Sequence, residues 1–450
     1  MADVEVTAPA MPPVPARRLR QALGVGFGVA VGVGSMIGAG ILRAPADVAA
    51  RLPSPWLFIG VWVVGGLYAL LGANALAELA TMIPRSGGQY VFAQRAFGAY
   101  AGFVVGWSDW LSTSASVAAI SLVFAEAATA LAGLPARATA PLGIAAVVVA
   151  SLVLGRGVTE SDRTQRLTSA LKAVALLALV LACLLVAHAP AAAAPPRPAG
   201  GIGAAAFVLA LQGVIYAYDG WTGVMYFSEE VRDAGRQIPR AAFGGVLAVI
   251  ALYVSINAAF LAVLPLDAMA RSALPAADVA RALAGARGAG LVRALVVVVL
   301  PSAIVANTLL GSRVAYALGR DGGAPAGLAR VSAAGVPTWG LAVTALAAVL
   351  FAATGTFERV IDVCAFLFVA SYVVSFAAVF VLRRREPDTP RPYRAWMHPW
   401  TTGFVLAGSI TFLVGVVVAD TRGALLALGL VAVSPPIFWL LRRTGLVASR

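Results

Sequence analysis

The sequence predicts an all-α membrane protein with twelve transmembrane helices. Of its 450 residues, 60% are hydrophobic and only 12% are charged, which is about half the charged fraction of an average soluble domain. Apolar runs recur along the whole chain, and most reach or approach the ~20 residues that a helix needs to cross the hydrocarbon core of a bilayer. A chain in lipid must satisfy its backbone polar groups internally, which favours helices. The runs cover residues 23–41, 56–77, 100–132, 138–154, 167–189, 204–227, 241–264, 291–311, 339–354, 360–382, 400–419 and 424–441.

The predicted elements follow one another in a simple order. Residues 1–22 are rich in proline and arginine and predict a disordered cytoplasmic tail. The apolar run that follows is a full span, so we expect no cleavable signal peptide. Spans one to five occupy residues 23–189, spans six to ten residues 204–382, and spans eleven and twelve residues 400–442. Residues 443–450 form a second cytoplasmic tail.

The formal net charge of +13 indicates orientation in the membrane. The basic residues are spread through the connections between spans, so we expect no nucleic-acid partner. With the N-terminus in the cytoplasm, the inside connections carry the larger share of arginine, which places both termini in the cytoplasm of a multi-pass protein of the cell membrane. The long connection after span seven is an exception that predicts a small external helical segment.

Few side chains support catalysis or metal binding. Both cysteines, Cys183 and Cys364, lie inside apolar runs, so neither a disulfide framework nor a metal site is supported. Neither His188 nor His398 has a plausible partner in the sequence. We therefore expect no cofactor, no metal and no enzymatic activity.

Two spans are interrupted by residues that weaken a helix. Span one contains the run from Gly34 to Gly40, with three glycines in seven residues, and each glycine costs up to ~1 kcal/mol relative to alanine. Close packing of small residues between helices is an alternative interpretation. Span six contains the run from Tyr216 to Trp221, in which Asp219 precedes Gly220, and a carboxylate within a membrane is a candidate functional group.

The two interruptions lie five spans apart in segments that enter the membrane from opposite sides. Residues 23–189 and 204–382 therefore read as two inverted halves of five helices each. Paired interruptions at equivalent places in inverted halves point to the midplane binding site of a secondary transporter.

Broken helices offer backbone groups of both polarities to a solute. N–H groups of Gly38, Ala39 and Gly40 stand at the positive end of a half-helix, which suits a carboxylate. Carbonyl groups near Met36 and Tyr216 suit an ammonium group. This pattern matches the two charged groups of an amino acid and leaves its side chain open.

Four segments resemble the amino acid–polyamine–organocation superfamily and, within it, the L-type amino acid transporter-like branch. They are GVGSMIGAGIL in span one, PRSGGQYVFAQRAFG after span two, YAYDGWTGVMYFSEEVRDAGRQIPRA in span six with its following loop, and SRVAYALGRDGGAP at the end of span eight. They occur in the family's order over roughly residues 23 to 340. The resemblance implies a LeuT-like 5+5 inverted-repeat fold and alternating access.

The resemblance also implies roles for individual residues. Backbone groups of Ala39 and Gly40 would bind the substrate carboxylate, carbonyls of Met36, Tyr216 and Asp219 the amino group, and the ring of Tyr216 would form the outer gate. The family varies at position 219, which leaves open whether the Asp219 side chain contacts substrate. The expected substrate-binding set is Ser35, Met36, Ile37, Gly38, Ala39, Gly40, Tyr216, Ala217, Tyr218, Asp219 and Gly220.

Lys172 is the only lysine among the 33 basic residues and lies in span five. It could reach the cytoplasmic face with its long side chain. Sodium-independent members of the family carry a lysine at the matching place, where its ammonium stands in for a sodium ion. The resemblance thus implies sodium-independent exchange or proton-coupled transport of amino acids, with Lys172 as the coupling residue. A sodium-coupled or polyamine transporter of the same fold, or a channel, is the alternative.

Eukaryotic relatives join a single-span partner through an external cysteine. No cysteine lies outside the predicted membrane spans here, so we expect no covalent partner subunit. The expected partners are the amino acid substrate and the lipid bilayer.

Overall fold

The computed structural model describes residues 25–85, 87–156, 162–186, 203–228, 231, 233–332, 336–354 and 357–443. Over these residues the regular elements are helices, and an isolated bridge pairs Val331 with Pro337. The predicted tail at residues 1–22 lies outside the described residues, and so does the predicted tail at residues 443–450 except for Arg443, the last residue of α16.

The helices follow the predicted apolar runs. The first part of the chain forms α1 (Val25–Met36), α2 (Ala39–Arg51), α3 (Pro55–Met82), α4 (Gln89–Phe97), α5 (Ala99–Ala132), η1 (Ala136–Ala138), α6 (Thr139–Gly155) and α7 (Asp162–Val186). The second part forms α8 (Ala204–Tyr218), η2 (Gly223–Phe227), α9 (Ala234–Val263), α10 (Leu266–Ala270), α11 (Pro275–Arg320), η3 (Ala326–Ala329), α12 (Thr338–Ala353) and α13 (Phe357–Arg385). The last part forms α14 (Trp400–Ala419), α15 (Thr421–Ala432) and α16 (Ser434–Arg443).

Many of these helices are suited to a bilayer. In the described part of the chain, eight helical segments are long and apolar enough to cross a membrane, and α1 with α2 forms a bent pair that would make a ninth span. Three further apolar helices are shorter, at Ala170–Leu185, Ala204–Tyr218 and Thr338–Ala353. The molecule is therefore an all-helical, multi-pass membrane protein, and the count of twelve spans stays a prediction.

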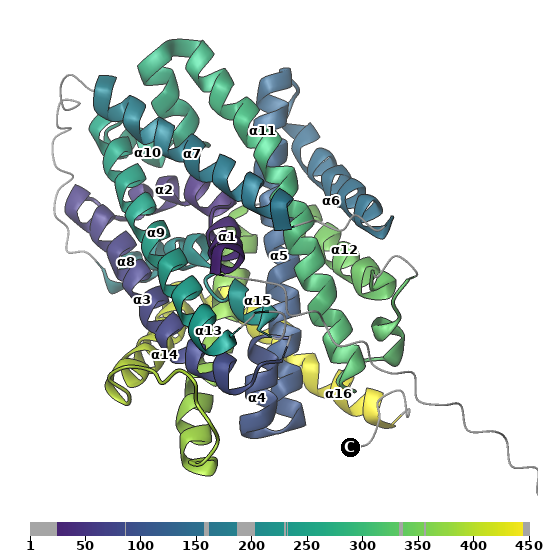
Figure 1. Ribbon diagram of the computed structural model, residues 1–450. Helices are drawn as coiled ribbons and strands as arrows, with labels where there is room; N and C mark the ends of the chain where they lie inside the picture. The colour runs from purple at the N-terminus through teal and green to yellow at the C-terminus, as the bar shows by residue number, and fades with distance from the viewer. Residues whose placement is uncertain are drawn as a thin grey trace, which may run out of the picture.

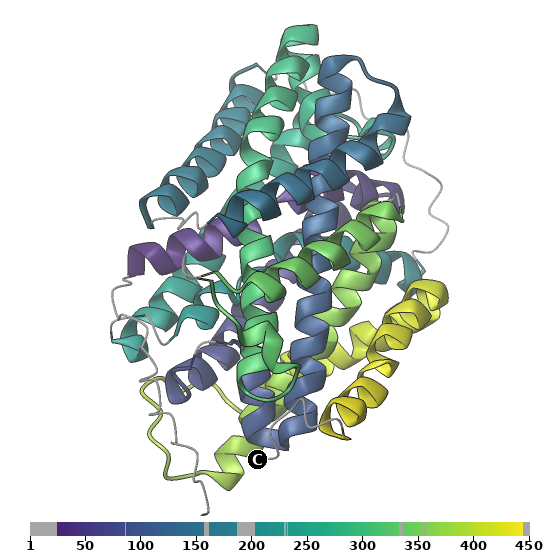
Figure 2. The ribbon, with the colours of Figure 1, turned by 90° about the vertical axis from the view of Figure 1, so that its right-hand side faces the viewer.

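The longest helices, α5 and α11, pack side by side through the middle of the bundle (Figures 1 and 2). The other contacts follow a pattern along the chain. Helix α2 packs on α8, α3 on α9, α5 on α11, and α6 on α12. Each of these four helices of the first part thus lies against the helix that the sequence analysis placed five spans later.

The connection after α9 is helical, as the sequence predicts. It holds the short helix α10 and the first turns of α11, before a kink at Ala284 and Gly285. Gly285 has φ +62°, a left-handed conformation that costs glycine little. In Figure 1, α10 lies at the opposite end of the bundle from α4.

Candidate functional site

The first predicted interruption is a break between two helices. Helix α1 ends at Met36, α2 begins at Ala39, and the two are bent by 41°. The sequence analysis expected the Gly38 N–H to be open to a ligand. In the structure this N–H donates to the carbonyl of Met36 at 2.8 Å, so it is already paired. The first N–H groups of α2, those of Ala39 and Gly40, have no intrahelical acceptor because every α-helix leaves its leading donors unpaired.

The second predicted interruption also ends a helix. Helix α8 stops at Tyr218, and Gly220 has φ +105°, which strongly favours glycine because other residues have a Cβ that clashes there. A Cβ built on Gly220 would lie 2.8 Å from the Cβ of Ser35. The chain therefore turns out of the helix where it presses on the end of α1.

The two breaks lie against each other. A Cβ built on Gly40 would lie 2.5 Å from the Cα of Ala217, so α2 and α8 approach at backbone distance. The hydroxyl of Tyr253, on α9, donates to the carbonyls of Met36 at 2.6 Å and Ala217 at 3.1 Å. Tyr253 was not among the predicted site residues, and its hydroxyl joins both breaks.

A cavity of about 60 Å³ lies at the junction of the breaks. This volume is several times the ~10–15 Å³ that one water molecule needs. Most of the predicted substrate-binding residues line it: Ser35, Met36, Gly38, Ala39, Gly40, Tyr216, Asp219 and Gly220. The sequence therefore located the two segments that form the cavity.

Four predicted residues do not line this cavity. Ile37 and Lys172 line a second, smaller cavity of about 30 Å³, which also touches Gly38 and is otherwise apolar. Ala217 contacts Gly40, as described above, and Tyr218 packs its ring against those of Trp62 and Tyr253.

The part of the main cavity that α5 lines is polar, and the sequence analysis did not predict its residues. It includes Asp109, Thr113 and Ser116 of α5. These positions are four and three residues apart, so they share one face of the helix. The sequence analysis did not include Asp109 in the predicted site, although the helical spacing of the three polar residues could have indicated a polar lining.

Two tyrosines hold the carboxylates that line the cavity. Tyr226 donates to Asp109 Oδ2 at 2.7 Å, and Tyr372 donates to Asp219 Oδ1 at 2.5 Å. Both tyrosines also line the cavity. Among the 20 residues of its lining, Asp109 and Asp219 are the acidic ones and none is basic.

Aromatic and charged groups pack next to Tyr216, which lines the cavity. The Tyr216 ring lies edge-on to Phe357, with 6.1 Å between ring centres. The guanidinium of Arg43 lies 5.7 Å from the centre of the Phe357 ring and 3.5 Å from the carboxylate of Glu126. Arg43 also donates to the carbonyl of Ala273. This layer connects α2, α5 and α13 above Tyr216, the predicted gate.

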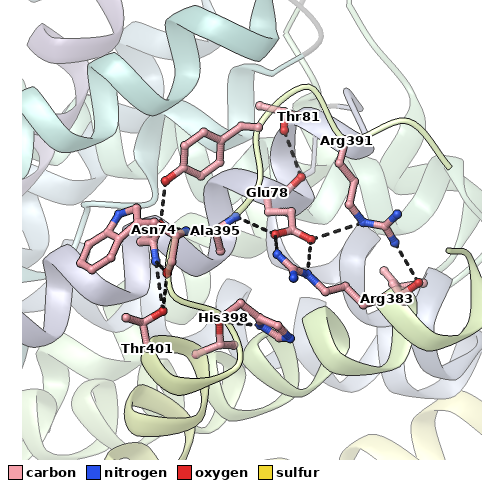
Figure 3. A network of polar contacts seen from close by, with 12 residues as sticks. Asn74, Glu78, Thr81, Arg383, Arg391, Ala395, His398 and Thr401 are labelled. Carbon is pink, nitrogen blue, oxygen red and sulfur yellow. Dashed lines mark hydrogen bonds and ion pairs between the residues drawn. The ribbon is translucent and has the colours of Figure 1, made fainter. Parts of the chain in front are cut away.

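A separate polar network fixes the loop between α13 and α14 (Figure 3). Its centre is Glu78 of α3, whose side chain is only 1% exposed. Arg383 donates to both Glu78 oxygens, at 2.8 and 2.5 Å, and the Ala395 N–H donates at 2.7 Å. The buried Arg391 Nε lies 3.3 Å from Glu78 Oε1. Glu78 is therefore a structural partner of arginine.

Asn74 extends this network one turn earlier on α3. Its Oδ1 accepts from the Tyr393 hydroxyl at 2.6 Å and from the Trp396 N–H at 3.1 Å. Its amide group donates to the carbonyl of Trp396 at 3.2 Å and to Thr401 at 3.3 Å. The loop is thus held through its backbone as well as its side chains.

In the ranges that the structure describes, no group of three or more His, Cys, Asp or Glu side chains could hold a metal ion. Cys183 and Cys364 are both buried and unbridged.

Known proteins resemble the chain over nearly its whole length. A family model described as amino acid permease matches residues 28–435. The serine/threonine exchanger SteT of Bacillus subtilis is 25% identical over 428 residues, which cover 94% of this chain and 97% of the exchanger. The branched-chain amino acid permease BcaP of Lactococcus lactis is 24% identical over 85% of this chain and 86% of its own. The large neutral amino acids transporter small subunit 2 of Oryctolagus cuniculus is 29% identical over 84% of this chain and 72% of its own.

Proposed function

Because the chain belongs to the amino acid permease family, we propose that it carries amino acids across the cytoplasmic membrane by alternating access. The family match confirms the resemblance to the amino acid–polyamine–organocation superfamily that the sequence motifs indicated. The family is one of transporters, in line with the expectation that the chain is not an enzyme.

The proposed architecture has twelve spans in a LeuT-like arrangement. The eight long segments, the bent pair α1–α2 and the three shorter apolar helices together supply the twelve. The contacts of α2 with α8, α3 with α9, α5 with α11, and α6 with α12 are those expected when two halves of five helices interlock. In this arrangement both termini are cytoplasmic.

The proposed substrate position follows from the broken helices. Ala39 and Gly40 line the cavity at the start of α2, where leading N–H groups lack an intrahelical acceptor and the helix dipole favours a carboxylate. The Met36 carbonyl already accepts from Gly38 and Tyr253, which uses the two lone pairs of a carbonyl oxygen. We therefore assign the substrate ammonium chiefly to Asp219, together with the backbone of α8, rather than to Met36.

Lys172 supports sodium-independent transport. Its side chain is 4% exposed and shares the smaller cavity with Ile37 and Gly38, so it lies beside the first break and apart from the main cavity. A lysine ammonium there supplies the positive charge that a bound sodium ion would otherwise bring to the break. Guanidinium is wider and planar, so arginine would not replace it.

A single observation carries the proposal: two helix breaks from different parts of the chain meet at one polar cavity. The same fold could serve a polyamine or another organic cation, but such a substrate would leave the N–H groups of Ala39 and Gly40 without an anion.

The test compares three ligands that share one side chain. A free amino acid, its methyl ester and the corresponding decarboxylated amine are titrated against the purified protein, with ligand-induced thermal stabilisation as the readout. We expect only the free amino acid to bind well, because the ester and the amine lack the carboxylate. Equal binding of the ester, or tighter binding of the amine, contradicts the proposed substrate position.

A further inference from the structure

The α5 wall of the main cavity has a consequence for substrate choice. We propose that the site selects amino acids with a short side chain that ends in a hydrogen-bond donor, and that Asp109 receives this donor. The inference rests on the proposed function, because it assigns the far end of the same amino acid.

Asp109 has acceptor capacity that the protein does not use. Asp109 is 5% exposed, and Tyr226 donates to one of its two carboxylate oxygens. No hydrogen bond to the other oxygen is found among the described residues, and the side chain lines the cavity. A carboxylate offers about four acceptor positions, so a ligand donor would meet an acceptor that is already oriented by Tyr226.

Thr113, one turn along α5, supplies an independent second observation. It is 4% exposed and lines the same cavity, yet its hydroxyl makes no hydrogen bond among the described residues. A threonine hydroxyl in a helix commonly bonds to the carbonyl four residues earlier, but Ser112 already donates to that carbonyl of Asp109, at 3.0 Å. The Thr113 hydroxyl is thus a second polar group open to the cavity.

The position of Asp109 sets the direction in which the side chain of the substrate points. In the proposed position the α-carboxylate and ammonium are held at the breaks, and Asp109, Thr113 and Ser116 of α5 line the same cavity. Asp109 is seven residues from Ser116, which is roughly 10 Å along a helix, so the polar groups of α5 are spread along the lining. The cavity is small, at about 60 Å³, which favours a short side chain.

The chemistry of this wall disfavours an aliphatic side chain. An aliphatic group would remove water from Asp109 and Thr113 without replacing its hydrogen bonds, and an unpaired buried polar group is costly. Sites built to hydrogen-bond a substrate group reject the analogue that lacks it strongly. Both a hydroxyl and an ammonium group meet the requirement.

Three amino acids of nearly equal shape test the proposal. Serine, 2,3-diaminopropionate and 2-aminobutyrate carry –CH₂OH, –CH₂NH₃⁺ and –CH₂CH₃ side chains. Their dissociation constants are measured on the purified full-length protein by calorimetric titration. We expect serine, diaminopropionate or both to bind at least about tenfold tighter than 2-aminobutyrate, since a hydrogen bond to a charged group is worth about one to two orders of magnitude in affinity. Tight binding of serine with weak binding of diaminopropionate identifies a substrate with a side-chain hydroxyl. The reverse order identifies a substrate with a side-chain ammonium group.

Asp109→Asn tests the residue itself. Asparagine keeps the size and an acceptor for Tyr226 but loses the charge, so the preference over 2-aminobutyrate should fall by about tenfold for diaminopropionate and less for serine. Thr113→Val should weaken the preference less than Asp109→Asn. Equal affinity of the wild-type protein for all three ligands, or unchanged ratios in Asp109→Asn, overturns the assignment while the proposed function stands. Absence of binding by every amino acid overturns both.

Discussion

Replacing Glu78 by alanine is expected to release the loop between α13 and α14 from the rest of the bundle. The substitution removes the acceptor of Arg383 and of the Ala395 N–H and leaves Arg391, whose side chain is 4% exposed, without its counter-charge. Arg391 cannot simply turn to water, because its two terminal nitrogens donate to four carbonyls, that of Leu382 in the last turns of α13 and those of Glu386, Pro387 and Thr389 in the loop.

The magnitude follows from the burial of this network. Breaking a buried ion pair by removing one partner costs about 3–5 kcal/mol, because the other charge stays buried. Each decade in an equilibrium constant corresponds to about 1.36 kcal/mol, so local opening of the loop should become roughly a hundredfold to several thousandfold more frequent.

Glu386→Ala is the matched control, because it removes a second carboxylate at the start of the same loop. Glu386 pairs with Arg95 at 2.7 and 3.0 Å, but their side chains are 27% and 38% exposed. The hydrogen bond from Arg95 lowers the pKa of the Glu386 carboxyl. Solvent screens such a pair, and exposed pairs contribute about 0–1 kcal/mol.

The assay is hydrogen–deuterium exchange of the Ala395 and Trp396 amides in detergent, since their protection reports local opening. Both N–H groups are hydrogen-bonded to α3 in the native protein. Fast exchange of both amides in Glu78→Ala, and near-native exchange in Glu386→Ala, is the expected result. Similar exchange in both variants would mean that burial does not determine how much this network stabilises the loop.

Three further predictions concern the site. Tyr216→Ala should reduce transport with little loss of thermal stability, because the ring covers the cavity; normal uptake into liposomes would contradict the gate, and failure to fold would make Tyr216 a core residue. Gly40→Ala should abolish substrate binding, since the added Cβ would lie 2.5 Å from the backbone of α8, whereas Gly38→Ala should be tolerated because nothing lies within 4 Å of its Cβ; similar affinities of the two variants would contradict this. Lys172→Ala should lose most transport activity and Lys172→Arg should not restore it, as measured by uptake at equal protein density; full activity in Lys172→Ala would remove Lys172 from the coupling mechanism.

The positions of the helix breaks were predictable from the sequence because local chemistry determines them. Gly38 and Gly220 weaken their helices whatever surrounds them, and both helices end within two residues of these glycines. The close approach at Gly40 also has a local signature, since a residue without a side chain is needed there. Hydropathy located the long spans for a similar reason, because each apolar run needs only lipid or another helix as its neighbour.

The polar wall and the tyrosine contacts could not be predicted in the same way. Tyr253 reaches Met36 across 217 positions of the chain, and Tyr372 reaches Asp219 across 153. Such pairs depend on how whole helices pack, and a tyrosine in an apolar span is equally compatible with the core or the lipid interface. Asp109 is a carboxylate within a predicted span, but only the packing of the helices shows that it lines the cavity.

The partners of Glu78 illustrate a further limit. An arginine is an ordinary partner for a carboxylate within a span, but the sequence offers many arginines and no rule for choosing Arg383 and Arg391. Their selection depends on the path of residues 386–399, a segment without regular helix. In this segment the backbone also donates a hydrogen bond to Glu78, through the Ala395 N–H.

Sodium-independent amino acid transport can be measured by uptake into reconstituted liposomes. The purified protein is placed in liposomes preloaded with an unlabelled mixture of the twenty amino acids, and entry of the same radiolabelled mixture is followed with external sodium or with choline in its place. We predict entry well above that of empty liposomes and equal rates in the two solutions. Entry no faster than in empty liposomes, or loss of most of it when choline replaces sodium, would contradict the account.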